Sequence, residues 1–321
     1  EQEDATSLNY KLYTSVQGAA VGETPFWQYA NTYGLRQANS RFNSATDLQL
    51  RMPRQVWGPV EMSTGARLTS RLSDASNTTH LSELYGTLWY RALRLRIGRF
   101  RHTIGGTDNP LSLGSMTISP NATPIPKIEF STRGFVALPL SDGRLRMRAY
   151  WAEGQLGEAR HVSQARLHQK SLHVRATGDR FRLTAGVIQN LQWGGRGGQN
   201  TWARYRDTLF NVKGGGAENT TAAYDIDLSV DMDTWEVGAY RQFYMEDWIG
   251  LLFRSPWDGL WGVSVERDNR HWVSDVVYEF MNTIQQDALP GLPEGRAKYY
   301  THHTYRSGWT YHGNVLGNPL I

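Results

Sequence analysis

The sequence predicts an all-β fold, an antiparallel transmembrane β-barrel, and three observations support this class. Apolar and polar residues alternate in blocks of about ten residues, which is the strand length of a membrane barrel. The 321-residue chain contains 12 Trp, 16 Tyr and 10 Phe, although its hydrophobic fraction is only 40%. Finally, no apolar run reaches the ~18 residues of a membrane helix, so a chain that spans a membrane must do so as a barrel.

The clearest alternation lies in residues 225–233. One face carries Ile, Leu, Val and Met, and the other carries four aspartates and a serine. Successive side chains of a strand point to opposite faces, whereas a helix would mix these two sets. Three further blocks are equally clear: residues 93–97, 144–151 and 180–187. Weaker blocks occupy residues 8–17, 46–52, 61–72, 81–90, 164–175, 234–244, 260–266 and 272–282. In total we expect about fourteen or fifteen strands.

Charged residues alternate with apolar ones in several of these blocks. The basic ladder consists of Arg94, Arg96, Arg144, Arg146, Arg148, Arg180 and Arg182. The acidic ladder consists of Asp225, Asp227, Asp231 and Asp233. An arginine near the middle of a membrane costs ~2–4 kcal/mol, so we expect both ladders to face the lumen. The main role we expect is pairing between neighbouring strands, and the alternative is a path for an acidic polymer.

Two stretches interrupt the alternation. Residues 105–126 are rich in Gly, Pro, Ser and Asn, which predicts a long ordered loop. Residues 193–216 begin with WGGRGG and end with GGG, and between these runs Trp202, Tyr205, Leu209 and Phe210 lie at helical spacing. This spacing predicts a short amphipathic helix within a second loop. Because the chain shows no linker or domain boundary, residues 1–321 are expected to form a single barrel domain.

Sequence motifs give no support for an enzyme, a metal site or a cofactor. Cysteine is absent, and neither the H-E-x-x-H zinc motif nor the G-x-S-x-G nucleophile motif occurs. The adjacent pair His302 and His303 would point to opposite faces of a strand, which disfavours a shared metal. A glycosidase needs two carboxylates ~5–10 Å apart, and the sequence places no such pair in a pocket. We therefore expect no catalytic residues, no metal and no cofactor.

The formal net charge is +4, and most of the basic residues are arginine, since lysine occurs at only five positions. Arginine binds carboxylates with two parallel hydrogen bonds, and sugar rings stack on aromatic faces. Aromatic residues and arginines beside turn-rich sequence are thus candidates for polysaccharide binding. The candidates are Trp193, Arg196, Trp257, Arg306 and Trp309. For each tryptophan taken singly, we favour a place in the aromatic girdle at the membrane surface.

Several segments together resemble the Wzi capsule-assembly family, in particular its Bacteroidetes-type members. They are TPFWQYANTYG (24–34), IGRF (97–100), LSLGSM (111–116), NATPIPKI (121–128), DGLWG (258–262), VVYEF (276–280), YRSGWTYHG (305–313) and LGNPL (316–320). Each segment alone is a weak signal. Their order and spacing extend over nearly the whole chain, which makes the set specific.

The resemblance implies an eighteen-stranded barrel in the bacterial outer membrane that holds acidic capsular polysaccharide as a lectin, with a lumen occluded by loops. The expected partners are this polysaccharide and outer-membrane lipid, without nucleic acid, and we expect a monomer. A porin-like channel for small anionic solutes is the alternative. An outer-membrane hydrolase of glycan or lipid is the third hypothesis.

Two features depart from the family pattern. Some relatives carry a helical bundle, which has no counterpart near the N-terminus, and family members continue beyond Ile321. The expected strand count also falls short of closure. We therefore expect that C-terminal strands are missing from this sequence. A complete barrel has no open strand edge, because such an edge is not tolerated inside lipid. Without the missing strands, we expect unpaired strand edges near residues 10–16 and 299–311.

Overall fold

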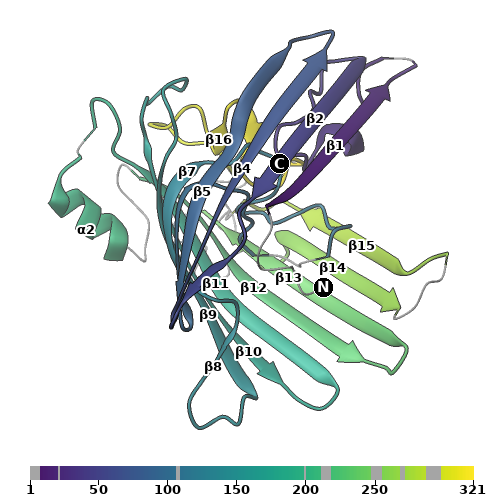
Figure 1. Cartoon of the computed structure of the whole chain (residues 1–321), viewed down its shortest axis with the longest axis vertical. Helices are drawn as coiled ribbons and strands as arrows, with labels where there is room; N and C mark the ends of the chain where they lie inside the picture. The colour runs from purple at the N-terminus through teal and green to yellow at the C-terminus, as the bar shows by residue number, and fades with distance from the viewer. Residues whose placement is uncertain are drawn as a thin grey trace.

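The computed structural model describes residues 8–20, 22–105, 109–198, 200–210, 218–246, 255–267, 272–286 and 298–321. Its main feature is a curved antiparallel sheet of 15 strands. The path through the sheet is β1-β2-β4-β5-β6-β7-β9-β10-β11-β12-β13-β14-β15, with β3 beside β4 and β8 beside β9. Figure 1 shows the sheet as a curved wall. We call its concave side the lumen.

The elements follow the chain in simple order. The strands of the sheet are β1 (Asn9–Gly18), β2 (Phe42–Arg51), β3 (Gln55–Trp57), β4 (Val60–Ser73), β5 (Thr78–Tyr90), β6 (Leu93–Arg99), β7 (Pro126–Thr132), β8 (Val136–Ala137), β9 (Leu145–Gln155), β10 (Arg166–Thr177), β11 (Phe181–Trp193), β12 (Asn219–Asp231), β13 (Trp235–Met245), β14 (Gly259–Arg267) and β15 (Asp275–Asn282). The helices are α1 (Phe26–Tyr29) and α2 (Trp202–Phe210), and β16 (Thr310–Tyr311) pairs with β17 (Asn314–Val315).

The predicted fold class is confirmed, and each predicted block overlaps a strand of the sheet. The sequence reading missed β7, which directly follows the long loop and begins with a proline. It also missed the short strands β3 and β8. The helix predicted within residues 193–216 is α2. Among the described residues, no helix is long and apolar enough to cross a membrane.

One of the two predicted edges is wrong. The last strand of the sheet is β15, and residues 299–311 instead fold back against other loops, where Trp309 is fully buried. Tyr305 and Tyr311 are buried beside it, so the aromatic residues of this segment find apolar partners that an edge strand would not supply. At the other end the prediction holds, since among the described strands β1 pairs only with β2.

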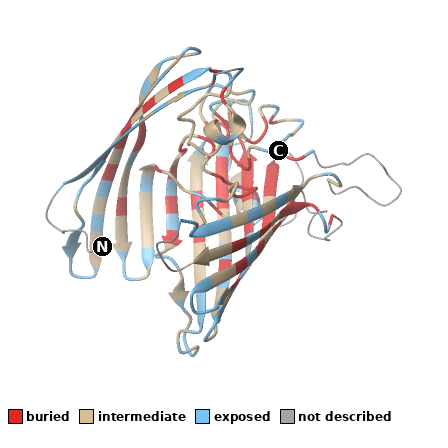
Figure 2. Ribbon diagram, turned by 90° about the vertical axis from the view of Figure 1, so that its right-hand side faces the viewer, coloured by how far each residue is buried: buried red, intermediate tan, exposed pale blue. Residues whose placement is uncertain are grey.

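The wall buries its polar face and exposes its apolar face. On β12, Asp225 is 6% exposed, whereas its neighbour Ile226 is 41% exposed. Figure 2 shows buried and exposed residues alternating along the strands in this way. A water-soluble sheet has the opposite polarity, with apolar side chains inside. An apolar outer face around a polar interior is typical of a barrel that spans a membrane.

The connections divide the sheet into a turn end and a loop end. At the turn end, strands are joined by tight turns such as residues 178–180 and 232–234. At the loop end, two long segments pack against each other and the inner wall to form what we call the cap. They are residues 100–125, of which 100–105 and 109–125 are described, and residues 298–321. The cap buries Ile104, Met116 and Trp309 in one apolar cluster, and Tyr300 donates a hydrogen bond to the backbone oxygen of Met116. The cap therefore fills the lumen at the loop end.

Candidate binding sites in the lumen and at the loop end

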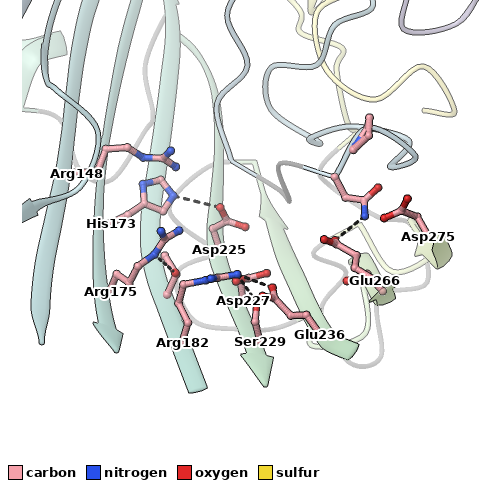
Figure 3. A pocket seen from close by; sticks show the side chains of 14 residues that line it. Arg148, His173, Arg175, Arg182, Asp225, Asp227, Ser229, Glu236, Glu266 and Asp275 are labelled. Carbon is pink, nitrogen blue, oxygen red and sulfur yellow. Dashed lines mark hydrogen bonds and ion pairs between the residues drawn. The ribbon is translucent and has the colours of Figure 1, made fainter. Parts of the chain in front are cut away.

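A cleft of about 280 Å³ lies in the lumen and receives side chains from β9 through β15. Its basic side chains come from β9, β10 and β11, and its acidic ones come from β12 to β15. Figure 3 shows Arg148, His173 and Arg175 on one side and Glu266 and Asp275 on the other. Charges of opposite sign thus face each other across the cleft. The alternation of each strand creates this arrangement, because every second side chain points into the lumen.

Several of these charges are paired, each with a partner two strands away in the sheet. Arg182 binds Glu236 with 2.6 Å between Nη2 and Oε1, and it also donates to the hydroxyl of Ser229. His173 Nε2 lies 3.2 Å from a carboxylate oxygen of Asp225. The sequence predicts that the ladders pair between neighbouring strands, whereas these two pairs each reach across an intervening strand. The two pairs satisfy polar groups that would otherwise be buried without partners.

Arg148 differs from its neighbours in the ladder. Its guanidinium lies over the ring of Phe135 at 4.8 Å, and Arg175 lies over the same ring at 3.7 Å. No carboxylate among the described residues lies within 4 Å of Arg148. This arginine therefore offers a cationic group to the cleft without a strand partner that neutralises it.

The remaining ladder residues have different environments. Arg94 binds Glu129 inside the lumen at 2.7 Å, and Arg96 lies over the ring of Phe100 at 4.3 Å. Asp227 lines the cleft. The turn end, which is open to solvent, holds the rest: Arg144, Arg146, Arg180, Asp231 and Asp233. The Arg180–Asp233 pair is 69% and 78% exposed, so alternation continued past the strand ends and did not place these residues in the lumen.

A second pocket of about 510 Å³ lies at the rim of the loop end, and we call it the rim pocket. It lies between the glycine-rich loop after β11, helix α2 and the cap. Its lining residues are Val162, Trp193, Gly194, Arg196, Gly197, Gly198, Arg204, Glu218, Thr304 and Tyr305. Tyr305 donates a hydrogen bond to the backbone oxygen of Gly194 over 3.2 Å, which fixes the cap against the loop.

Two buried polar groups in the rim pocket have unused hydrogen-bonding capacity. Arg204 binds Oε1 of Glu218 at 2.8 Å, but Oε2 of this buried carboxylate has no hydrogen-bond partner in the described part of the chain. The indole Nε1 of Trp193 likewise has none, although Trp193 is 1% exposed. Buried polar groups in native proteins are nearly always satisfied. Both atoms are buried, so a ligand with donors and acceptors, such as a sugar, would satisfy them once the side chains that cover them move.

The sequence matches the family described as Capsule assembly protein Wzi over residues 14–320. The chain belongs to the Wzi family. A comparison with solved structures agrees with this, because the chain is similar to Wzi of Escherichia coli. That protein is described as an outer membrane protein involved in group 1 capsule assembly and as a carbohydrate-binding β-barrel. The identity is 17% and the TM-score is 0.60, over 97% of this chain and 63% of that chain. At this identity the likeness shows the fold.

Two further solved structures show a weaker likeness. OccAB2 of Acinetobacter baumannii is 10% identical with a TM-score of 0.40, over 86% of this chain and 82% of that chain. OmpT of Vibrio cholerae is 9% identical with a TM-score of 0.43, over 95% of this chain and 94% of that chain. A search of curated protein sequences gave no match. As a Wzi-family barrel, the chain is an outer-membrane protein.

The structure of this Wzi-family chain brings two of the five predicted polysaccharide-binding residues together. Trp193 and Arg196 both line the rim pocket. Arg306 follows Tyr305 in the cap, where it is exposed and donates to the backbone oxygen of His303 over 3.3 Å. Tyr305 lines the rim pocket, but Arg306 does not.

The other two candidates have surroundings of a different kind. Trp257 stacks on Trp261 with 6.1 Å between ring centroids, and the guanidinium of Arg241 lies 3.4 Å from the Trp261 ring. Trp261 and Arg241 lie on the outward-facing side of β14 and β13, which is the surface expected for an aromatic girdle. Trp309 is fully buried in the cap and donates a hydrogen bond to Thr117. Neither tryptophan lines the rim pocket.

Sequence reasoning missed the other residues of the rim pocket, among them Arg204, Glu218 and Tyr305. Arg204 lies in the predicted amphipathic helix, where a charged residue is normally interpreted as part of the solvent-exposed face. Glu218 is a single acidic residue ahead of β12, without any motif around it. Tyr305 belongs to a segment far away in the sequence. Among the described residues, no group of three or more His, Cys, Asp or Glu side chains is placed to hold a metal ion.

Proposed function

We propose that this chain is a capsule-assembly protein that binds acidic polysaccharide at the loop end of its barrel, with the rim pocket as the binding site. The observation that carries the proposal is the pair of unsatisfied polar atoms beside two arginines. Trp193 Nε1 can donate to a sugar oxygen, and Glu218 Oε2 can accept from a sugar hydroxyl or amide. The described carbohydrate binding of Escherichia coli Wzi supports the same substrate class.

The charge of the rim pocket favours an acidic sugar. Arg204 is neutralised by Glu218, but Arg196 lies 3.9 Å from Glu158 in a pair whose side chains are about 70% exposed. Such an exposed pair contributes little, so Arg196 remains available to a carboxylate on the ligand. Arg306 adds a second exposed positive charge beside the pocket. The volume of about 510 Å³ lies within the ~300–1,000 Å³ typical of ligand pockets.

The position of the pocket suits a surface polysaccharide. In outer-membrane barrels the long loops face the outside of the cell and the short turns face the periplasm. The rim pocket lies at the loop end, where a polymer on the cell surface would meet the protein. The cap fills the lumen at this end, which favours binding over the porin-like alternative, because a channel needs an open path.

The test is binding of the detergent-purified protein to the capsular polysaccharide of its source organism, measured at low and high salt. The same polysaccharide with its carboxyl groups reduced to alcohols is the matched ligand control. We expect saturable binding that weakens with salt, and weaker binding of the reduced polymer. Arg196→Gln should lower the affinity about tenfold, since a hydrogen bond to a charged group contributes ~1.5–3 kcal/mol.

Arg180→Gln is the matched protein control, because Arg180 lies at the turn end, far from the rim pocket, and should leave affinity unchanged. Equal binding of the native and the reduced polysaccharide would contradict an acidic ligand. Absence of binding at either salt concentration would overturn the polysaccharide role. In that case, conductance in a planar bilayer would test whether the lumen conducts small anions.

A further inference from the structure

Helix α2 lies on the outer side of the barrel wall. Figure 1 shows it beside the convex face of the sheet, away from the lumen. Its contacts agree with this position: Lys170 Nζ on β10 donates to the backbone oxygen of Leu209 over 2.6 Å, and Tyr205 packs on Trp193 of β11 with ring centroids 5.5 Å apart. On β10, Lys170 alternates with the lumen-facing His173 and Arg175, so its side chain points outward.

The helix turns an aromatic face away from the wall. Trp202 is 75% exposed and Phe210 is 72% exposed. Arg206 lies between them at intervals of four residues, so all three side chains follow one stripe of the helix. Thr208 is buried on the opposite face. Tyr205, whose ring lies 5.3 Å from that of Trp202, lies between the two faces and packs on the wall. A solvated helix would not be expected to present two large aromatic residues to water.

The apolar band of the wall beneath α2 is too short to span a membrane by itself. On β10 the exposed apolar residues begin at Leu172, so the band runs over the last six residues of the strand. A strand rises ~3.3 Å per residue, so six residues tilted by ~45° cover roughly 14 Å along the membrane normal. The apolar band of a membrane barrel is ~25 Å tall. The part of β10 that lacks exposed apolar residues is the part that α2 covers.

Ionisable groups occupy the outer wall at that height. His168 Nδ1 lies 2.5 Å from a carboxylate oxygen of Glu153, and both side chains point outward from β10 and β9. Without α2 this pair and Lys170 would face lipid, which is costly for charged groups. The helix covers them and presents Trp202 and Phe210 in their place.

From these relationships we infer that α2 lies in the lipid headgroup layer of the outer membrane, with Trp202 and Phe210 at the acyl-chain boundary and Arg206 beside anionic headgroups. Amphipathic helices that lie in a membrane surface combine aromatic anchors with cationic residues in this way. The same combination recurs elsewhere on the outer wall, where Arg241 of β13 lies over Trp261 of β14. This inference depends on the membrane barrel and not on polysaccharide binding.

The absence of cysteine from the sequence allows a direct test. Trp202→Cys and Phe210→Cys would each carry a nitroxide label in the protein reconstituted into phosphatidylethanolamine–phosphatidylglycerol vesicles. The depth of each label is measured from its collision rates with oxygen and with a water-soluble nickel chelate. Leu172→Cys is the control within the apolar band, and Leu140→Cys, at a fully exposed turn, is the control in water.

We expect both helix labels to lie about 5–10 Å below the headgroup boundary, shallower than Leu172→Cys and deeper than Leu140→Cys. Both substituted residues are largely exposed; Trp202→Cys removes a ring contact with Tyr205 of the same helix, so the Phe210→Cys reading checks it independently. The two positions provide independent readings of the same depth. If both labels collide with the nickel chelate as readily as the Leu140→Cys label does, α2 lies in water and the inference is overturned.

Discussion

The indole Nε1 of Trp309 donates a hydrogen bond to the backbone oxygen of Thr117 over 2.7 Å, although 192 positions separate the two residues in the sequence. The bond joins the two segments of the cap. Ser119 makes a parallel link by donating to the backbone oxygen of Gly317 over 2.5 Å. Because Trp309 is fully buried in the same apolar cluster as Met116, its side chain both packs the cap and fixes the relative position of its segments.

Replacing Trp309 by alanine should loosen both cap segments. A buried tryptophan truncated to alanine costs ~3–5 kcal/mol, through lost packing and the cavity that remains. We expect faster hydrogen–deuterium exchange in residues 100–125 and 298–321, and unchanged exchange in the strands of the wall. Mass spectrometry of peptides from the refolded barrel gives this measurement.

Trp309→Phe provides the matched control, since it keeps an aromatic ring and loses the hydrogen bond to Thr117. Its effect should be smaller, because one hydrogen bond contributes only ~1 kcal/mol net. An increase in exchange restricted to residues 298–321 in Trp309→Ala would show that the two segments are not held together by this side chain.

The contact between β5 and β6 predicts a second effect. Gly98 has φ +127°, and a Cβ atom at this position would lie 2.1 Å from the backbone oxygen of Leu84. Gly98→Ala should therefore destabilise the barrel by about 1–3 kcal/mol, since the backbone must leave a conformation that only glycine adopts readily. The measurement is the urea midpoint of unfolding in micelles.

Gly86, on β5, is the control for this substitution, because a Cβ there would meet no atom within 4 Å. Gly86→Ala should change the free energy of unfolding by no more than about 0.5 kcal/mol. Equal midpoints for the two variants would show that the close approach at Gly98 relaxes without cost.

Most of the wall could be predicted from the sequence because its long strands, β7 excepted, each carry their own periodic signal. The ends of the ladders could not be predicted, because the alternation of polar and apolar residues continues to Arg180 and Asp233, beyond the ends of the strands. Alternation alone does not indicate where hydrogen bonding between strands stops. The cap escaped prediction for a different reason. Its packing joins Thr117 to Trp309, and neither segment carries a periodic pattern that reveals its partner.

The rim pocket was predictable only in part. Trp193 and Arg196 are close in the sequence and stand out beside glycines, so their types and neighbours suggested sugar binding. The pocket also needs Glu218 and Tyr305, which are brought there by the return of β12 and by the cap. Such a meeting of three segments depends on tertiary contacts that local patterns do not encode.

His302 predicts a pH dependence at the rim pocket. Its Nδ1 accepts backbone hydrogen bonds from Thr304 and Tyr305, both at 3.2 Å, which requires this nitrogen to be unprotonated. Burial, together with the nearby charge of His303, lowers the pKa of His302 from 6.5 to about 4. Between these values the unfolded chain binds the proton and the folded chain does not. Stability from this group is therefore present above pH 6.5 and is lost as the pH falls to about 4.

We expect acidification through this range to loosen residues 302–305 and weaken polysaccharide binding at the rim pocket. His302→Gln should flatten the part of the pH profile that lies between 6.5 and about 4, because an amide oxygen can accept the same hydrogen bonds without titrating. The measurement is affinity against pH for both proteins. Profiles of the same shape would assign the acid sensitivity to other groups, including those of the polysaccharide.

A network of buried charges in the N-terminal half of the wall predicts a large change in stability. Arg67 binds Glu83 with 2.5 Å between Nε and Oε1, and Asp47 with 3.2 Å between Nη1 and Oδ2, and all three side chains are buried. Arg67→Met would leave two buried carboxylates to share Arg101 alone, which contacts each of them at 3.2 Å. Removing one partner of a buried ion pair costs ~3–5 kcal/mol, so the urea midpoint should fall strongly.

Arg180→Met is the comparison, because Arg180 also forms an ion pair, with Asp233, but in an exposed turn. Solvent screens such a pair, and its loss should cost no more than about 1 kcal/mol. The two variants remove the same group and insert the same side chain, so the difference between their midpoints reports burial of the charge network. A difference near zero would mean that water enters the lumen beside Arg67 and screens Asp47 and Glu83 as fully as it screens the turn.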